Sequence, residues 1–365
     1  MTLSPADDYP IHQTAQPVRW VATSDRNFYD RYYFNCHPSS DELFLIAGMG
    51  QYPNLGVQDA FALVYHDGHH RVVRASRELG ADRMDTSVGP FRVEVLEGLK
   101  RLRMVLEPNE WDVAFDLTWE GAVPAHLEPQ HVVRRHERLV FDSARLSQTG
   151  SWSGTLVVAG NEFAVTPDRW WGARDRSWGV RPVGEAEPPG IFAGDVPQFC
   201  WIYSPVRFAD YSVAVIVQEN ADGSRIVEEA NRVWSFEKGG AVEPLGTPEQ
   251  EIEFEPGTRT VRRARFTFSE SDLVITTTPV LPVHVGVGTG YGLDADWRHG
   301  MWQGPLKVEG LDLDLSKEED AARMWGIVDA VARSEASDGA VGWGLFEYLF
   351  IGPNARYGWT GFDDA

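Results

Sequence analysis

The residues best suited to chemistry lie in one short run, residues 170–181, where tryptophans and arginines surround a single acid. The acid is Asp175, the tryptophans are Trp170, Trp171 and Trp178, and the arginines are Arg174, Arg176 and Arg181. Side chains of a β-strand alternate between faces, so Asp175 shares a face with Ser177, and its two flanking arginines take the other. Beside tryptophan rings on the inner face of a barrel, an aspartic acid is desolvated, which raises its pKa and keeps it protonated. We therefore predict that Asp175 donates a proton and that the six aromatic and basic residues of the run bind substrate.

A second interpretation of this run stays open at the level of sequence. In it, Asp175 is ionised and pairs with Arg174, Arg176 or Arg181, so that the run is a structural ion-pair cluster between two halves of the chain. Structural ion pairs also perturb titration, and the residue types alone do not separate these two roles.

Another aromatic and polar group follows the glycine-rich residues 286–292. A dinucleotide-binding loop must lie between a strand and a helix, and residues 294–300 offer no amphipathic helix, so we interpret the glycines as a strand end near a ligand. Tyr291 and His299 are candidate catalytic residues here, and Trp297 is a candidate substrate contact. His299 is either an acid or base, or a hydrogen-bonded structural residue.

Two further regions carry isolated polar residues. Glu347 lies in the strongly apolar residues 341–351 together with Trp343, a candidate substrate contact. A buried glutamate needs a partner or a function, so we expect Glu347 to pair with an arginine of residues 170–181, or otherwise to be a second catalytic acid. Asn54 and Asp59 follow a turn at the mouth of the expected barrel, where they either shape the loop or bind the ligand.

The sequence lacks the patterns of several common catalytic sites, and we expect neither a cofactor nor a metal. His66, His69 and His70 flank a turn without the carboxylates or cysteines of a defined metal site. Trp152 stands where a hydrolase elbow would need its serine, and a phosphate-binding loop is missing.

The elements that must position these residues are short strands. Apolar alternation predicts strands at residues 42–47, 61–65, 101–106 and 111–119. Asp67-Gly68, Asp222-Gly223, Gly239-Gly240 and Asp338-Gly339 accept the positive φ of tight hairpin turns. The last of these turns predicts a hairpin of residues 327–334 with residues 341–351, and a capping-box spacing at Ser316 predicts a helix toward Met324. We expect an all-β fold: two tandem lipocalin-like (calycin-type) antiparallel β-barrels or sandwiches with few helices.

The chain of 365 residues is longer than one hydrophobic core usually organises. Proline, glycine and glutamate cluster in residues 182–197, which predicts a domain boundary there. We therefore expect an N-terminal extension at residues 1–26, a first lipocalin-like domain at residues 27–190 and a second at residues 191–365.

The bulk composition limits the partners. A formal net charge of −21 repels phosphate backbones and anionic lipids, which counts against nucleic-acid and membrane-surface roles. The sequence shows neither a signal peptide nor an apolar run of membrane-spanning length, and its two cysteines, Cys36 and Cys200, are expected to be buried free thiols. We expect a cytoplasmic protein whose partner is a hydrophobic small molecule, and a homodimer stays open.

Three segments give the chain a resemblance to a known family. They are residues 174–179 (Arg-Asp-Arg-Ser-Trp-Gly), residues 291–300 and residues 342–347. In their pattern of Arg, Asp, Trp and Gly, the chain resembles the carotenoid hydratase (hydroxyneurosporene synthase) and AttH-like group, over residues 28–362. The resemblance implies two lipocalin-type barrels and cofactor-free hydration or cyclisation of an isoprenoid or polyketide-like substrate.

Two functions follow as expectations. The first is a lyase or isomerase that hydrates, dehydrates, isomerises or cyclises a hydrophobic small molecule, with Asp175 as proton donor. The second is a non-catalytic lipocalin-like carrier or sensor of an apolar ligand.

Overall fold

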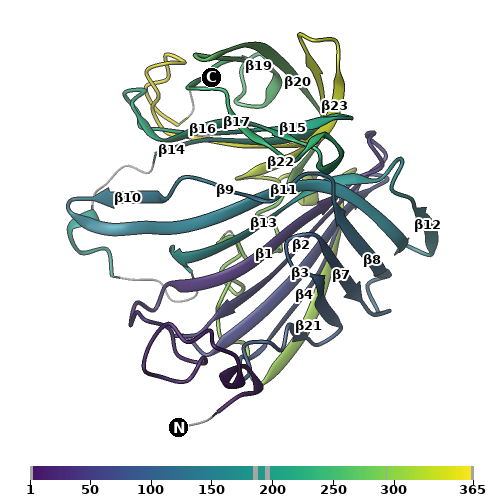
Figure 1. The fold of residues 1–365 in the computed structure, drawn as a ribbon, viewed down its shortest axis with the longest axis vertical. Coiled ribbons are helices and arrows are strands. Elements are labelled where there is room, and N and C mark those ends of the chain that lie inside the picture. Colours follow the sequence, from purple (N-terminus) through teal and green to yellow (C-terminus); the bar gives the residue numbers. More distant parts are fainter. Residues whose placement is uncertain (1–2, 184–187, 194–197, 293, 363–365) are drawn as a thin grey trace.

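The computed structural model describes residues 3–183, 188–193, 198–292 and 294–362 of the chain. Regular structure in these residues is almost all β-strand, in two large antiparallel sheets that each curl (Figure 1). The short helices are α1 (Glu318–Ala321) and the 3-10 helices η1 (Pro5–Asp8), η2 (Gly190–Phe192) and η3 (Phe236–Lys238). None of the helices in the described residues has the length and apolarity needed to cross a membrane.

The first sheet has fourteen strands, and its main order is β21-β4-β3-β2-β1-β13-β11-β8-β7-β6-β5. Three short strands, β9, β10 and β12, pair with the long strand β11 outside this path. The bounds are β1 (Phe28–Cys36), β2 (Leu43–Tyr52), β3 (Val57–His66), β4 (His69–Glu78), β5 (Ser87–Val88), β6 (Phe91–Glu97), β7 (Arg101–Leu106), β8 (Val113–Gly121), β9 (His126–Leu127), β10 (His131–Arg135), β11 (Arg138–Val158), β12 (Asn161–Val165), β13 (Trp171–Val180) and β21 (Leu306–Asp314).

The second sheet has nine strands in the order β17-β16-β15-β14-β23-β22-β20-β19-β18. Figure 1 shows it, in green and yellow, above the first sheet. The bounds are β14 (Phe199–Arg207), β15 (Tyr211–Glu219), β16 (Arg225–Trp234), β17 (Val242–Pro244), β18 (Pro248–Phe254), β19 (Val261–Phe268), β20 (Ser271–His284), β22 (Val328–Ala336) and β23 (Val341–Ile351).

Apolar side chains fill the interior of each curled sheet and the space between the two sheets. One cluster, with Phe34 and Trp152, belongs to the first sheet, and another, with Phe266 and Phe346, belongs to the second. A third cluster joins residues of both sheets, so the two pack face to face. Strand β2 shows the result: it is buried along its whole length, because one face packs into the first cluster and the other into the third. Strands β11 and β13 reach the second sheet, where both contact β14.

The predicted all-β, lipocalin-like fold class is confirmed, and so are the strands predicted from alternation, which coincide with β2, β3, β7 and β8. Asp67 and Gly68 join β3 to β4 with φ of 51° and 74°, as their turn chemistry predicted. The hairpin around Asp338-Gly339 is also confirmed, as β22 and β23.

The predicted helix from Ser316 toward Met324 is shorter than expected. Strand-end Asp314 accepts hydrogen bonds from both the amide and the hydroxyl of Ser316, at 3.1 and 2.6 Å. Because the Ser316 hydroxyl is used there, it does not cap the helix, and α1 is a single turn that begins at Glu318.

The division into domains at residue 190 stays a prediction, and residues 184–187 and 194–197 of the predicted boundary lie outside the described residues. One strand from the C-terminal half, β21, pairs along its whole length with β4 of the first sheet (Figure 1). The first sheet is therefore built from both halves of the chain.

Candidate functional site

A cavity of about 390 Å³ lies between the two sheets. Strands β1, β10, β11 and β13 of the first sheet line it on one side, and β14, β15, β16 and β23 of the second line it on the other. Its apolar wall is made by Val133, Val140, Phe141, Phe199, Trp201, Ile216, Val227 and Ile327. This volume is in the range of small-molecule sites, so the cavity is the candidate functional site.

Strand β13 brings Asp175 into this cavity. The strand alternates as predicted, so Asp175 and Ser177 face the cavity while Arg174 and Arg176 face the opposite side, toward the first sheet's own core. There Arg174 Nε donates to Gln148 Oε1 at 2.8 Å, and Arg176 pairs with Asp30. The inner face of the first barrel, where Asp175 was expected, therefore holds its neighbours, and Asp175 itself faces the second sheet.

Three guanidinium groups surround Asp175 without forming an ion pair with it. Burial raises the pKa of Asp175, while the charges of Arg145, Arg31 and Arg181 and a hydrogen bond with Ser177 act to lower it. Among the described residues, no ion pair joins Asp175 to an arginine, although Arg181, one of the partners that the ion-pair interpretation names, acts on its carboxyl by charge.

A second carboxyl group enters the cavity from the other sheet. Glu347 on β23 lines the cavity and lies opposite Asp329 on β22. The indole Nε1 of Trp201 donates to Glu347, and Tyr33 Oη donates to Asp329 Oδ2 at 2.5 Å. The expected pairing of Glu347 with an arginine of residues 170–181 is wrong, since its partners are the indole of Trp201 and the carboxyl of Asp329.

Glu347 and Asp329 form a coupled pair of acids. Burial raises the pKa of both carboxyls, and their proximity raises that of Asp329 further. Asp329 Oδ1 is buried and receives no N–H or O–H donor from the described residues. A proton held between the two carboxyls satisfies this oxygen, so the pair retains at least one proton at neutral pH.

The far end of the cavity contains Tyr291 with Arg31 and Arg181. Arg31 Nη2 donates to Tyr291 Oη at 3.1 Å, and the Arg31 guanidinium lies 5.0 Å from the centre of the Tyr291 ring. The Arg181 guanidinium lies 5.8 Å from the same ring. Both guanidinium groups therefore lie close to the Tyr291 ring.

His299 and Asp59 support Tyr291 from behind and do not line the cavity. The His299 ring packs edge-on against Tyr291, with centroids 4.7 Å apart, and its Nδ1 lies 3.6 Å from Asp59 Oδ2. Asp59 also accepts from the Gly300 amide at 2.7 Å. Burial lowers the pKa of His299 to about 4, so its ring is neutral at neutral pH. This arrangement fixes the loop that carries Tyr291.

The other residues predicted to bind substrate also lie outside the cavity lining. Trp170 packs in the first sheet's core, Trp171 lies under Arg207, and Trp178 is 36% exposed on the surface. Trp297 packs under Arg74, and Trp343 packs at the edge of the cluster between the sheets. Asn54 Nδ2 donates to the carbonyls of Thr23 and Asp25, both at 2.8 Å, which shapes the turn. Of the predicted site residues, the cavity brings together Asp175, Arg181, Tyr291 and Glu347.

Several residues of the site were not predicted. Arg145 on β11 pairs with the buried Glu128 and lies 4.3 Å from the centre of the Tyr203 ring. Burial raises the pKa of Glu128 to about 7. Asp329 carried a related signal, because it lies between the apolar residues Val328 and Ala330.

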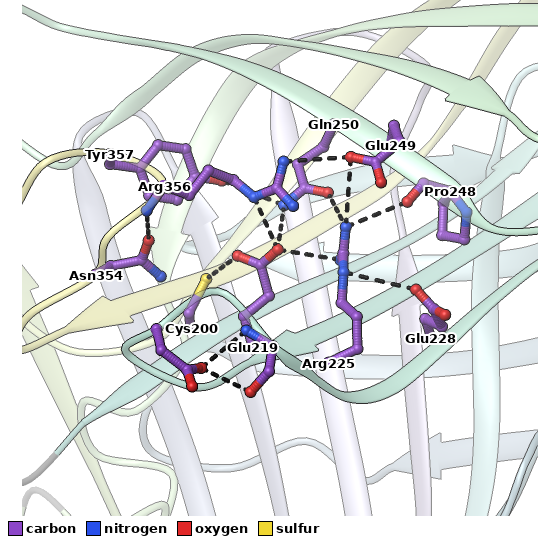
Figure 2. A network of polar contacts seen from close by, with 12 residues as sticks. Cys200, Glu219, Arg225, Glu228, Pro248, Glu249, Gln250, Asn354, Arg356 and Tyr357 are labelled. Carbon is purple, nitrogen blue, oxygen red and sulfur yellow. Dashed lines mark hydrogen bonds and ion pairs between the residues drawn. The ribbon is translucent and has the colours of Figure 1, made fainter.

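The densest ion-pair network lies elsewhere, at the end of β15 in the second sheet (Figure 2). Glu219 is buried there between Arg225, at 3.3 Å, and Arg356, at 2.9 Å. Gln250 and the Cys200 thiol also contact Glu219. Because Arg356 lies beyond the last strand, the network fastens the C-terminal segment to the sheet.

Known proteins resemble this chain mainly in fold. No curated protein matches it. The crystal structure of an AttH candidate from Nitrosomonas europaea superposes with a TM-score of 0.55 at 14% identity, covering 95% of this chain and 99% of that one. Kievitone hydratase from Nectria haematococca (TM-score 0.44, 12% identity, 88% of each chain) and CghA (TM-score 0.45, 10% identity, 89% of this chain and 88% of that one) are more distant.

The likeness to the AttH candidate shows a shared fold, while the resemblance to carotenoid hydratases stays a prediction. A family model matches residues 3–360, nearly the whole chain. This protein belongs to that family, DUF8625, a family of unknown function.

Proposed function

We propose that the protein is an enzyme that adds and removes protons on a hydrophobic small molecule, so as to hydrate, dehydrate, isomerise or cyclise it without a cofactor. One observation carries this proposal: Asp175 from the first sheet and Glu347 from the second enter the same aromatic-walled cavity. Buried acids that form no ion pair are costly to stability, and their placement at a cavity is typical of acid–base sites. An isoprenoid or polyketide-like molecule suits the apolar wall.

The two acids have different surroundings, which favours different roles. Glu347 shares a proton with Asp329, so it is the proton donor. Asp175 is surrounded by Arg31, Arg145 and Arg181, whose charges favour its carboxylate, so it is the proton acceptor. This assignment reverses the role that the sequence alone suggested for Asp175.

The chemistry balances with these two groups alone. In hydration, Glu347 protonates one carbon of a double bond while Asp175 takes a proton from the attacking water, and the reverse sequence is dehydration. In isomerisation, Glu347 protonates one carbon and Asp175 removes a proton from another. Proton exchange with solvent then resets both carboxyls.

The test begins with the ligand retained by freshly purified protein, identified by native mass spectrometry. That ligand is incubated in D₂O with newly prepared protein. We expect deuterium incorporation or a mass change equal to one water. A ligand that comes through unchanged supports the carrier function instead and contradicts the enzyme.

Variants assign the roles. Glu347→Gln and Asp175→Asn should each reduce deuterium incorporation by roughly 100-fold or more while the ligand still binds. Glu229→Gln is the matched control, because Glu229 is a partly buried acid of the second sheet that does not line the cavity. Full activity in both cavity variants would remove the carboxyls from the mechanism.

A further inference from the structure

The cavity is lined by four arginines, two of which lie close to the Tyr291 ring. Arg181 and Arg31 both line it, and neither forms an ion pair with any residue that the structure describes. Arg31 is only 4% exposed and its Nη1 is buried without a hydrogen-bond partner, while its Nη2 donates to the neutral hydroxyl of Tyr291. An unpaired buried guanidinium is destabilising, so this arrangement calls for an anion that is supplied from outside.

The other two arginines of the cavity differ from each other. Arg145 pairs with Glu128, whereas Arg135 forms no ion pair with a described residue and donates to the neutral Gln198 carbonyl at 3.2 Å. The charges of Arg31 and Arg181 act on Asp175, and that of Asp59 acts on Arg31, but neither carboxylate forms an ion pair with either arginine. Guanidinium N–H groups at the Tyr291 end of the cavity therefore lack a direct carboxylate partner among the described residues.

Aromatic rings hold these two guanidiniums in place. Arg181 lies 5.4 Å from the centre of the Tyr29 ring and 5.8 Å from that of Phe141, and Arg31 lies over Tyr291. Stacking of this kind orients the planar fork while leaving its N–H groups free to meet an acceptor. Guanidinium forks bind carboxylates and other oxyanions with good geometry.

We infer that the ligand carries an anionic oxygen group, a carboxylate, enolate or phenolate, which binds between Arg31 and Arg181 while its apolar body lies against Trp201 and Phe199. This inference rests on the proposed function for the identity of the site. An anionic ligand also removes a conflict in the proposed reaction. Guanidinium groups oppose a free carbocation, but they stabilise negative charge on oxygen. Proton transfer at carbon then proceeds next to a conjugated oxyanion.

Two fluorescent probes test the charge preference without any need to know the ligand. Anilinonaphthalene sulfonate and N-phenylnaphthylamine share the same aromatic body, and only the first carries an anion. Fluorescence titration of the full chain should show the sulfonate binding roughly tenfold more tightly than the neutral probe. Equal affinities, or a preference for the neutral probe, would overturn the inference.

Variants show whether the preference belongs to these two arginines. Arg181→Gln and Arg31→Gln should each weaken sulfonate binding by roughly tenfold and leave the neutral probe unchanged, which also shows that the cavity is intact. Arg135→Gln removes the same charge from the cavity arginine that donates to the Gln198 carbonyl and should change sulfonate affinity less than about twofold. An equal loss in Arg135→Gln would mean a diffuse charge effect and would contradict the assignment.

A cavity-filling variant locates the probes. Ile216→Trp should abolish binding of both, and persistence of either one would place it outside the cavity and overturn the inference. Because no probe is turned over, this result is independent of the acid–base test. Loss of the sulfonate preference with intact deuterium incorporation rejects only the anion site, whereas a retained preference with no incorporation rejects only the enzyme.

Discussion

Asp329 and Glu347 face each other across neighbouring strands β22 and β23, and each also accepts one hydrogen bond, from Tyr33 and Trp201 respectively. Two buried carboxyls in contact cannot both ionise readily, so the proton that they share belongs to the pair. This relationship gives the cavity a protonated acid at neutral pH.

Replacing Asp329 by asparagine should remove that proton. Burial and the charge of Glu347 raise the pKa of Asp329, which favours the proton on Asp329, and the asparagine amide can still donate to Glu347 in its place. Infrared spectroscopy should show a protonated-carboxyl carbonyl band in the wild type at neutral pH and lose it in Asp329→Asn. Asp59→Asn serves as the control, and an unchanged band in Asp329→Asn would contradict the shared proton.

Trp201→Phe should weaken the site while keeping its apolar wall. The indole N–H is a hydrogen-bond donor to Glu347, and this bond lowers the pKa of the carboxyl. Its loss should raise the pKa of Glu347 and cost about 1–3 kcal/mol in the free energy of unfolding. Urea denaturation and a pH titration of the infrared band measure the two effects, and Trp178→Phe on the surface should show neither.

His126→Phe should reduce the loss of folding stability at acidic pH. Both ring nitrogens of His126 are buried without partners among the described residues, and burial lowers its pKa to about 4. The unfolded chain, with an ordinary histidine pKa near 6.5, therefore binds more protons between these values, and the wild type loses stability as pH falls through this window. The loss reaches at most about 1.4 kcal/mol per pH unit.

Thermal unfolding at neutral pH and near pH 5 checks this prediction. The stability of His126→Phe relative to the wild type should rise on acidification. A difference that stays constant with pH would show that His126 is not neutral in the folded protein. His12→Phe, on the exposed N-terminal segment, is the control.

Glu219→Ala should destabilise the second sheet. It leaves Arg225 and Arg356 without their buried carboxylate, and breaking a buried ion network in this way costs about 3–5 kcal/mol. The surface pair of Arg262 and Glu253 offers a matched control, since Glu253→Ala should cost less than about 1 kcal/mol. Denaturant unfolding compares them, and equal losses would show that the Glu219 network adds nothing.

The sequence predicted the strands well because burial on one face of a sheet imposes an alternation that is visible locally. It also singled out Asp175 and Glu347, both of which line the cavity. Their partners were not predictable, since Arg31, Arg145 and Trp201 lie on ordinary strands and reach the cavity only through packing between sheets. The three tryptophans of residues 170–181 do not line the cavity, because Trp170 fills the core of the first sheet, Trp171 stacks with Arg207 and Trp178 lies at the surface.

The pairing of β21 with β4 has consequences for folding during synthesis and for the behaviour of fragments of the chain. During synthesis, β4 emerges more than two hundred residues before its neighbour, so its backbone donors and acceptors stay open until most of the chain has been made. A fragment that ends near residue 190 would keep this edge uncovered and should self-associate. Co-expressing the C-terminal remainder, which carries β21, should suppress that association, and the two pieces should reassemble as a noncovalent complex.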